Sequence, residues 1–451
     1  MIPLKYVLIT SLLLSINTIG IFGQVPVVTT PRPGTLSPGV NIGFPANRNN
    51  PAPNIPALPG FNNNNQQQLD MVRRDMLEVQ RRNAEMQRMS NGDSEYFSSN
   101  WGIRYELPSC VGMPGTEYFY QTAEKLLDML SGKTPLNLKE AVFSVENAYF
   151  EGNIDRTKYE KAISELVTIA QVKAKQDGLN WNNPTTKNIM LFRVMSDTLK
   201  LKLPARESST VSYPMQYDFD DFWAKEDITK LFVTKLLASH SGQCHSLPLL
   251  YLILCEATGA EANLTFSPMH SYIKFKDRQG NWNNLELTIG RIVTDAFIIG
   301  SGFITTEAIK NGLYMEPQTK KQAIAHCLND LAMYYERKYG YDKFLIQCAD
   351  SALKYAPGNF SILAMKSNYH SAHFEYTARQ AGWPPQDTLK VHYPRIYELY
   401  EERNNFYQKI DNMGYREMPK DIYEVWLRSL DEEKERREHD EKYHKILQFA
   451  K

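Results

Sequence analysis

The segment Leu247–Ala257 restricts the fold most strongly, because it is apolar on nearly every side. A helix that is hydrophobic all round is buried in a core and does not lie on a surface. Pro248 lacks the amide hydrogen of the helical ladder, so the helix must begin only a few residues before it. Gly259 is a typical left-handed helix cap. The sequence therefore predicts a buried helix whose first turn is at or next to Cys244.

Beyond Gly259 the apolar residues alternate with polar ones, which indicates strands. The segment Asp277–Gly280 has the composition of a hairpin turn between the last two strands. The unit is therefore predicted to be a core helix followed by a short antiparallel sheet. Its three strands are marked by Ala262, Leu264 and Phe266, then Ser271, Ile273 and Phe275, then Trp282, Leu285 and Leu287.

Three residues of this unit form a candidate catalytic set. Cys244 lies where unpaired backbone N–H groups and the helix dipole favour a thiolate. His270 can act as its base, and Glu286 can fix the tautomer of that imidazole. Directly opposed side chains share one face of a hairpin, and we expect a loop that pairs Phe275 with Asn281, which places His270 opposite Glu286. A four-residue loop would put the two on opposite faces.

These motifs resemble the transglutaminase-like superfamily. The resemblance is carried by Gly242-Gln243-Cys244-His245-Ser246-Leu247, Pro268-Met269-His270-Ser271-Tyr272 and Trp282-Asn283-Asn284-Leu285-Glu286-Leu287-Thr288. It implies a papain-like or transglutaminase-like core with Cys244 as nucleophile, His270 as base and Glu286 as orienting carboxylate. The family usually has Asp in the third position, so Glu286→Asp is expected to be tolerated. The helices after Lys320 resemble bacterial members in which a tetratricopeptide-like repeat follows the core.

Other residues are candidates for supporting roles in this site, and others again are candidates that the sequence does not favour. Gln243 is a candidate oxyanion or substrate contact, and Tyr272 and Trp282 are candidates for lining the cleft. The proposed chemistry requires no cofactor, and the absence of CxxC or paired Cys/His ligands predicts no metal site. His370 and His373 have a spacing compatible with a metal, but no third ligand is evident. His245 is expected to point elsewhere on the helix.

The N-terminus predicts export. Residues 1–23 have the basic start and apolar run of a signal peptide, although a retained membrane anchor is the alternative. Residues 24–100 are predicted to form a disordered tether rich in proline and asparagine that contains one short helix. The protein is therefore expected in the periplasm, on the cell surface or secreted, with no integral membrane domain after cleavage.

The rest of the chain predicts an α+β fold in three parts. A helical N-terminal body covers 101–217, the core 218–319, and tetratricopeptide-like and long C-terminal helices 320–451. The N-terminal body is expected to contain helices at Thr116–Leu130, Leu138–Glu151, Arg156–Gln176 and Thr185–Leu201, and a further helix is expected at Ile228–Ser239.

Charge and cysteine content limit the function. Lys plus Arg equal Asp plus Glu at 51 each, so no long-range field favours nucleic acid as a partner. Five cysteines cannot all pair within one chain, so at least one thiol is free or bound to a partner. The sequence thus predicts a thiol enzyme acting on amide bonds of a protein or peptide, by hydrolysis or acyl transfer. The alternative is a non-catalytic scaffold that binds a protein partner through its C-terminal helices.

Overall fold

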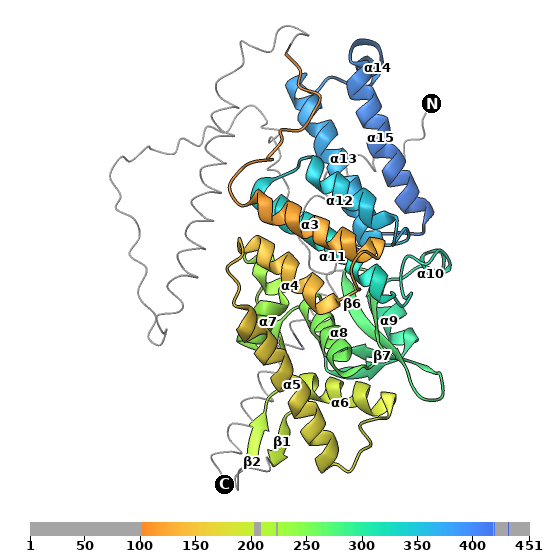
Figure 1. The fold of residues 1–451 in the computed structure, drawn as a ribbon. Coiled ribbons are helices and arrows are strands. Elements are labelled where there is room, and N and C mark those ends of the chain that lie inside the picture. The colour runs from red at the N-terminus through yellow and green to blue at the C-terminus, as the bar shows by residue number, and fades with distance from the viewer. Residues whose placement is uncertain (1–101, 203–208, 222–223, 418, 420–431, 433–451) are drawn as a thin grey trace, which may run out of the picture. The chain divides into compact units, whose positions relative to one another are not determined.

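The computed structural model describes residues 102–202, 209–221 and 224–417, together with 419 and 432 (Figure 1). The predicted signal peptide and tether, and most of the chain beyond 417, lie outside the described residues. The described part is α+β, mostly helical with a few short sheets. Its residues 105–376 and those from 385 onward belong to one compact unit, and 104 and 377–384 belong to a second. The boundaries predicted at 217 and 319 therefore fall inside one unit.

The predicted N-terminal helices form where the apolar spacing places them. Side chains of Asn137, Asp155 and Asn183 accept hydrogen bonds from the first-turn amides and so cap three of the helices. These four helices are α3 (Thr116–Ser131), α4 (Leu138–Tyr149), α5 (Arg156–Gln176) and α6 (Pro184–Ser196).

The last of these helices is shorter than predicted. It ends at Ser196, and the chain continues as strand β1 (Leu199–Lys202), which pairs with β2 (Ser209–Ser212). Leu199 and Leu201 are buried whereas the lysines between and after them are exposed. This alternation has the period of a strand, so the helix ends at Ser196, five residues before the predicted Leu201.

The predicted core unit lies in the middle of the chain. Helix α8 (Ser246–Thr258) packs against strands β5 and β6, and Gly259 caps it in the left-handed conformation as predicted (Figure 1). The four-stranded antiparallel sheet runs in the order β5 (Asn263–Ser267), β6 (His270–Lys276), β7 (Trp282–Glu286) and β8 (Arg291–Val293). The fourth strand was not predicted. Before α8 lie β3 (Gln216–Tyr217), η1 (Ile228–Leu231), α7 (Val233–Ser239) and β4 (Ser241–Gly242), so the single helix predicted there is split.

The register of the β6–β7 hairpin differs from the prediction by two residues. Phe275 pairs with Asn283 and Lys276 with Trp282, so the loop comprises residues 277–281. The Asp277 side chain accepts hydrogen bonds from the amides of Gln279 and Asn281, which stabilises this five-residue loop. A shift of two leaves every side chain on its predicted face. The predicted direct pairing of His270 with Glu286 is therefore wrong, but their common face is retained.

The C-terminal helices share a core with the N-terminal ones. The helix pair α11 (Lys320–Tyr339) and α12 (Lys343–Leu353) occupies the place predicted for a tetratricopeptide-like pair. Helix α11 also packs against α3 and α4, and the ring of its Tyr335 lies 5.5 Å from that of Phe119. The remaining helices are α9 (Asp295–Gly302), α10 (Thr306–Lys310), α13 (Phe360–Gln380), α14 (Gln386–His392) and α15 (Pro394–Asn412). Within the described ranges, no helix combines the length and apolar character needed to cross a membrane.

Candidate active site

The turn before α8 positions Cys244. A Cβ atom on Gly242 would lie 2.6 Å from Ser246 Oγ and 3.0 Å from Leu236 Cδ1, so only glycine fits here without a shift. Ser246 Oγ accepts a hydrogen bond from the Gln243 amide, at 2.9 Å. The amide of Leu247 donates to the Gln243 carbonyl at 3.0 Å, so helical bonding already includes Cys244. The prediction that the buried helix begins at or next to Cys244 is confirmed, because α8 begins at Ser246 and Cys244 lies in the turn directly before it.

The three candidate catalytic residues meet on one face of the sheet. His270, the first residue of β6, donates from Nε2 to Glu286 Oε2 at 2.6 Å. A hydrogen bond also links the imidazole to Cys244, and because Nε2 is engaged by Glu286, Nδ1 is the nitrogen left for the thiol. The arrangement is a thiol, an imidazole and a carboxylate in series, the order that thiol catalysis requires.

The carboxylate of Glu286 is held from both sides. Its Oε1 accepts hydrogen bonds from the Thr288 amide at 3.1 Å and from the Thr288 hydroxyl at 2.7 Å. Burial favours the neutral acid, but the attraction of His270 and the bonds from Thr288 outweigh it and lower the pKa of Glu286. Glu286 is therefore an ionised, fixed acceptor at neutral pH.

The charge state of His270 follows from the same contacts. Burial opposes a positive charge on the imidazole, yet the attraction of Glu286 and of Cys244 outweighs it. The pKa of His270 is consequently raised well above its usual value. This is the environment of an imidazolium paired with two acidic groups.

Access to the thiol is restricted in this conformation. Cys244 is 0% exposed, whereas the His270 side chain is 24% exposed. The hydroxyl of Ser271 donates to the Cys244 carbonyl at 2.5 Å and ties the first turn of α8 to β6. A substrate carbonyl can reach the sulfur only after neighbouring groups move.

The three residues predicted to contact substrate are placed otherwise. Both amide hydrogens of Gln243 are used by backbone carbonyls, with Nε2 donating to Asp218 at 3.0 Å and Asp221 at 3.2 Å. Tyr272 is completely buried in a cluster of apolar side chains. Trp282 is 44% exposed at the turn end of the hairpin, under the Lys276 ammonium. Gln243 therefore has no side-chain amide hydrogen left for a substrate beside Cys244, whereas its Oε1 and the Tyr272 hydroxyl are buried without a hydrogen-bond partner.

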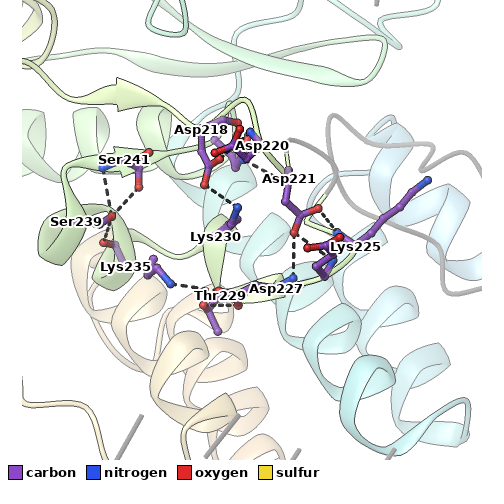
Figure 2. Close-up of polar contacts among 12 residues, drawn as sticks. Asp218, Asp220, Asp221, Lys225, Asp227, Thr229, Lys230, Lys235, Ser239 and Ser241 are labelled. Carbon is purple, nitrogen blue, oxygen red and sulfur yellow. Dashed lines mark hydrogen bonds and ion pairs between the residues drawn. The ribbon is translucent and has the colours of Figure 1, made fainter. Parts of the chain in front are cut away.

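Gln243 instead stabilises the acidic segment Asp218–Asp221 through hydrogen bonds to its backbone. Strand β3 pairs in parallel with β4, and the Asp218 amide donates to the Gly242 carbonyl at 2.9 Å. Figure 2 shows how the acidic side chains of this region are used. Asp218 forms an ion pair with Lys230 at 3.0 Å, and Asp221 accepts from three successive backbone amides, those of residues 225, 226 and 227. These carboxylates stabilise the loop that supports the turn containing Cys244.

Two buried residues near this site are not among the candidates that the sequence suggested. His326 and Asp330, four residues apart on α11, lie beside His245, the residue that follows Cys244. A His-x-x-x-Asp spacing on one helix face was the available signal. His370 and His373, whose spacing is compatible with a metal, do not share a site. His370 lies near Glu402 and stacks on Phe406, whereas His373 contacts the Tyr105 carbonyl.

Comparisons with known proteins add little. No family model matches the chain, and no curated protein matches it either. One similar solved structure is that of menin, reported as revealing the binding site for the Mixed Lineage Leukemia (MLL) protein. The similarity has a TM-score of 0.29 and 13% sequence identity, over 65% of this chain and 74% of that chain. A TM-score this low does not establish a shared fold.

Proposed function

We propose that this protein is a transglutaminase-like thiol enzyme that cleaves or transfers amide bonds. The observation that carries the proposal is the 2.6 Å contact between His270 Nε2 and Glu286 Oε2, with the same imidazole hydrogen-bonded to Cys244. The position of the cysteine directly before a buried helix supports it further, because the unpaired amides at a helix start can stabilise the oxyanion of an acyl intermediate.

The mechanism assigns one role to each residue. His270, as an imidazolium, holds the proton of the Cys244 thiol, and the sulfur attacks the amide carbonyl to form a C–S bond. The C–N bond breaks as His270 returns the proton to the departing amine, which leaves a thioester on Cys244. Water or a second amine then attacks the thioester and frees the sulfur. Glu286, held by Thr288, keeps the imidazole oriented and balances its charge throughout.

The substrate class and location are part of this proposal. The thioester route suits a peptide or isopeptide amide, and balanced net charge gives no reason to expect nucleic acid. We place the enzyme outside the cytoplasm because residues 1–23 have the layout of a signal peptide. A protein or peptide at the cell surface is then the substrate.

A second candidate function is a non-catalytic scaffold that binds a protein partner. The complete burial of Cys244 favours it, because a sulfur closed to solvent needs no catalytic purpose. The other cysteines provide a reference for this reading. Burial raises the pKa of Cys255, Cys327 and Cys348, and all three are inert packing residues.

Covalent labelling separates the two candidates. The purified protein is incubated at pH 7 with an electrophilic peptide-amide mimic, and adducts are located by mass spectrometry. An enzyme forms one adduct on Cys244, and His270→Ala slows its formation about 100-fold or more. Cys110→Ser is the matched control, since Cys110 is the partly exposed thiol, and it leaves the adduct in place. A scaffold is labelled at Cys244 only after denaturation, or at the same rate with and without His270.

A further inference from the structure

A second cluster, of two imidazoles and one carboxylate, includes His245, the residue that follows Cys244. His245 caps the start of α8, and His326 and Asp330 project from α11. All three residues are more than nine-tenths buried. His245 Nε2 lies 3.5 Å from Asp330 Oδ2, and His326 Nε2 lies 3.5 Å from Asp330 Oδ1. One donor atom from each residue falls within 4.8 Å of the others.

These separations suit a shared cation better than direct hydrogen bonds. Charge-assisted bonds between imidazole and carboxylate are about 2.7–2.9 Å long. Two ligands bound tetrahedrally at the usual zinc distance are about 3.3 Å apart, close to the separations seen here. The 3.5 Å contacts between Asp330 and the two imidazoles are therefore long for hydrogen bonds and near those of a common ligand set.

Unsatisfied polar atoms point to the same conclusion. Asp330 Oδ1 and His326 Nδ1 are both buried without a hydrogen-bond partner. A buried carboxylate oxygen without a partner is costly, and such groups in native structures need an explanation. A cation between the three side chains would satisfy the oxygen.

The local charge also leaves room for a cation. Glu146 is buried nearby, where its carboxylate acts on His245 and accepts the amides of Val233 and Thr234. Burial raises the pKa of Glu146 to about 7, so its carboxylate is only partly ionised at neutral pH, and Asp330 supplies the carboxylate that faces both imidazoles.

We propose that His245, His326 and Asp330 bind one divalent transition metal ion, with zinc the best fit. Two imidazoles and one carboxylate are a zinc donor set, with a fourth position for a water molecule. Redox metals with the same donors need open positions for oxygen and co-substrate, and these three side chains are closed off from solvent. The ion ties the start of α8 to α11, and so fixes the turn that carries Cys244.

Metal content of the full-length protein tests this site without reference to activity. The protein is purified without a histidine tag, stripped with a chelator and titrated with zinc or cobalt. We expect one equivalent per chain, visible cobalt absorption, and a melting temperature about 5 °C or more higher with excess zinc. The melting comparison uses only the unaltered chain, so it does not depend on any variant folding.

Four variants locate the ion. Asp330→Asn and His326→Gln are expected to weaken zinc binding at least tenfold, in line with losses seen for other metal sites. His370→Gln, a half-buried histidine on α13, is the matched control and keeps the full equivalent. Cys244→Ala also keeps it. The proposal is overturned if the folded wild-type protein binds no stoichiometric zinc or cobalt, if Asp330→Asn and His326→Gln bind like wild type, or if Cys244→Ala abolishes binding.

Discussion

Two pairings of imidazole with carboxylate lie on either side of the same turn, and they differ in distance and exposure. His270 and Glu286 are 2.6 Å apart, and the imidazole is 24% exposed. His245 and His326 each lie 3.5 Å from Asp330, in a cluster closed off from solvent. Cys244 contacts the first pair, and its neighbour in sequence belongs to the second.

The difference indicates what each group can do. A short bond from one carboxylate fixes an imidazole and stabilises its positive charge, which serves proton transfer. One carboxylate between two imidazoles, with a long contact to each and with Asp330 Oδ1 left without a hydrogen-bond partner, is suited to sharing a cation. The turn from Gly242 to Ser246 couples the two groups, since it carries a member of each.

The largest expected effect comes from Glu286→Gln. The amide oxygen can still accept from Thr288, so the fold is kept, but the imidazolium loses its counter-charge and its tautomer is wrong. We expect the rate of Cys244 labelling to fall about 1000-fold, measured at pH 7 by mass spectrometry. Zinc stoichiometry should stay unchanged, because Glu286 is not in the second cluster. A loss of zinc together with labelling would show that the two groups are not separate.

Glu286→Asp is the matched variant that keeps the charge. Continuing the β6–β7 register places Tyr272 opposite Glu286, so His270 is a diagonal neighbour. Diagonal neighbours are about 7–8 Å apart, compared with about 4.5–5.5 Å for direct pairs. The additional methylene of glutamate therefore spans the diagonal, and we expect aspartate to lose about tenfold in labelling rate. Full activity of this variant would support the directly opposed register expected from the sequence.

A smaller effect is expected from Gly242→Ala, which disturbs both groups at once. The new methyl would meet Ser246 Oγ and Leu236 Cδ1 at 2.6 and 3.0 Å, and such overpacking costs about 1–3 kcal/mol. Gly300→Ala in α9 is the control, since a Cβ there meets nothing within 4 Å. It should be neutral or slightly stabilising. Urea denaturation of both variants measures the difference, and equal stabilities would mean that the turn tolerates a larger residue.

Local patterns predicted much of the site. The helix around Leu250, its glycine cap at Gly259 and the strands that follow depend on residues close in sequence, so periodicity was sufficient. The face shared by His270 and Glu286 was also predictable, because it depends only on whether the register is odd or even. The register of the hairpin was predicted two residues out, because the Asp277 side chain fixes the loop at residues 277–281.

Contacts between distant segments could not be predicted in this way. His326 and Asp330 meet His245 only because α11 packs beside the start of α8, 81 residues after it in the chain. Gln243 appeared free to face substrate because nothing in the sequence shows that the Asp218–Asp221 carbonyls lie beside it. Such pairings depend on tertiary packing, which local periodicity does not report.

The smallest expected effect is a pH dependence of stability that belongs to the His270–Glu286 pair. His270 has a raised pKa in the folded protein, so its contribution is fully present below its usual value of 6.5 and is lost as pH rises through the raised value. Glu286 has a lowered pKa, so its contribution is present above its usual value of 4.5 and is lost as pH falls through the lowered value. The free energy of unfolding of wild type minus that of Glu286→Gln should therefore be greatest between pH 4.5 and 6.5. The difference is expected to be about 1 kcal/mol, typical of one net hydrogen bond.

Urea denaturation across pH 4 to 9 in excess chelator measures this difference, and the subtraction removes groups common to both proteins. Excess zinc should leave the difference unchanged if the pair is independent of the second cluster. A difference that does not vary with pH would mean that His270 carries no proton in the folded protein, and would remove the imidazolium from the mechanism.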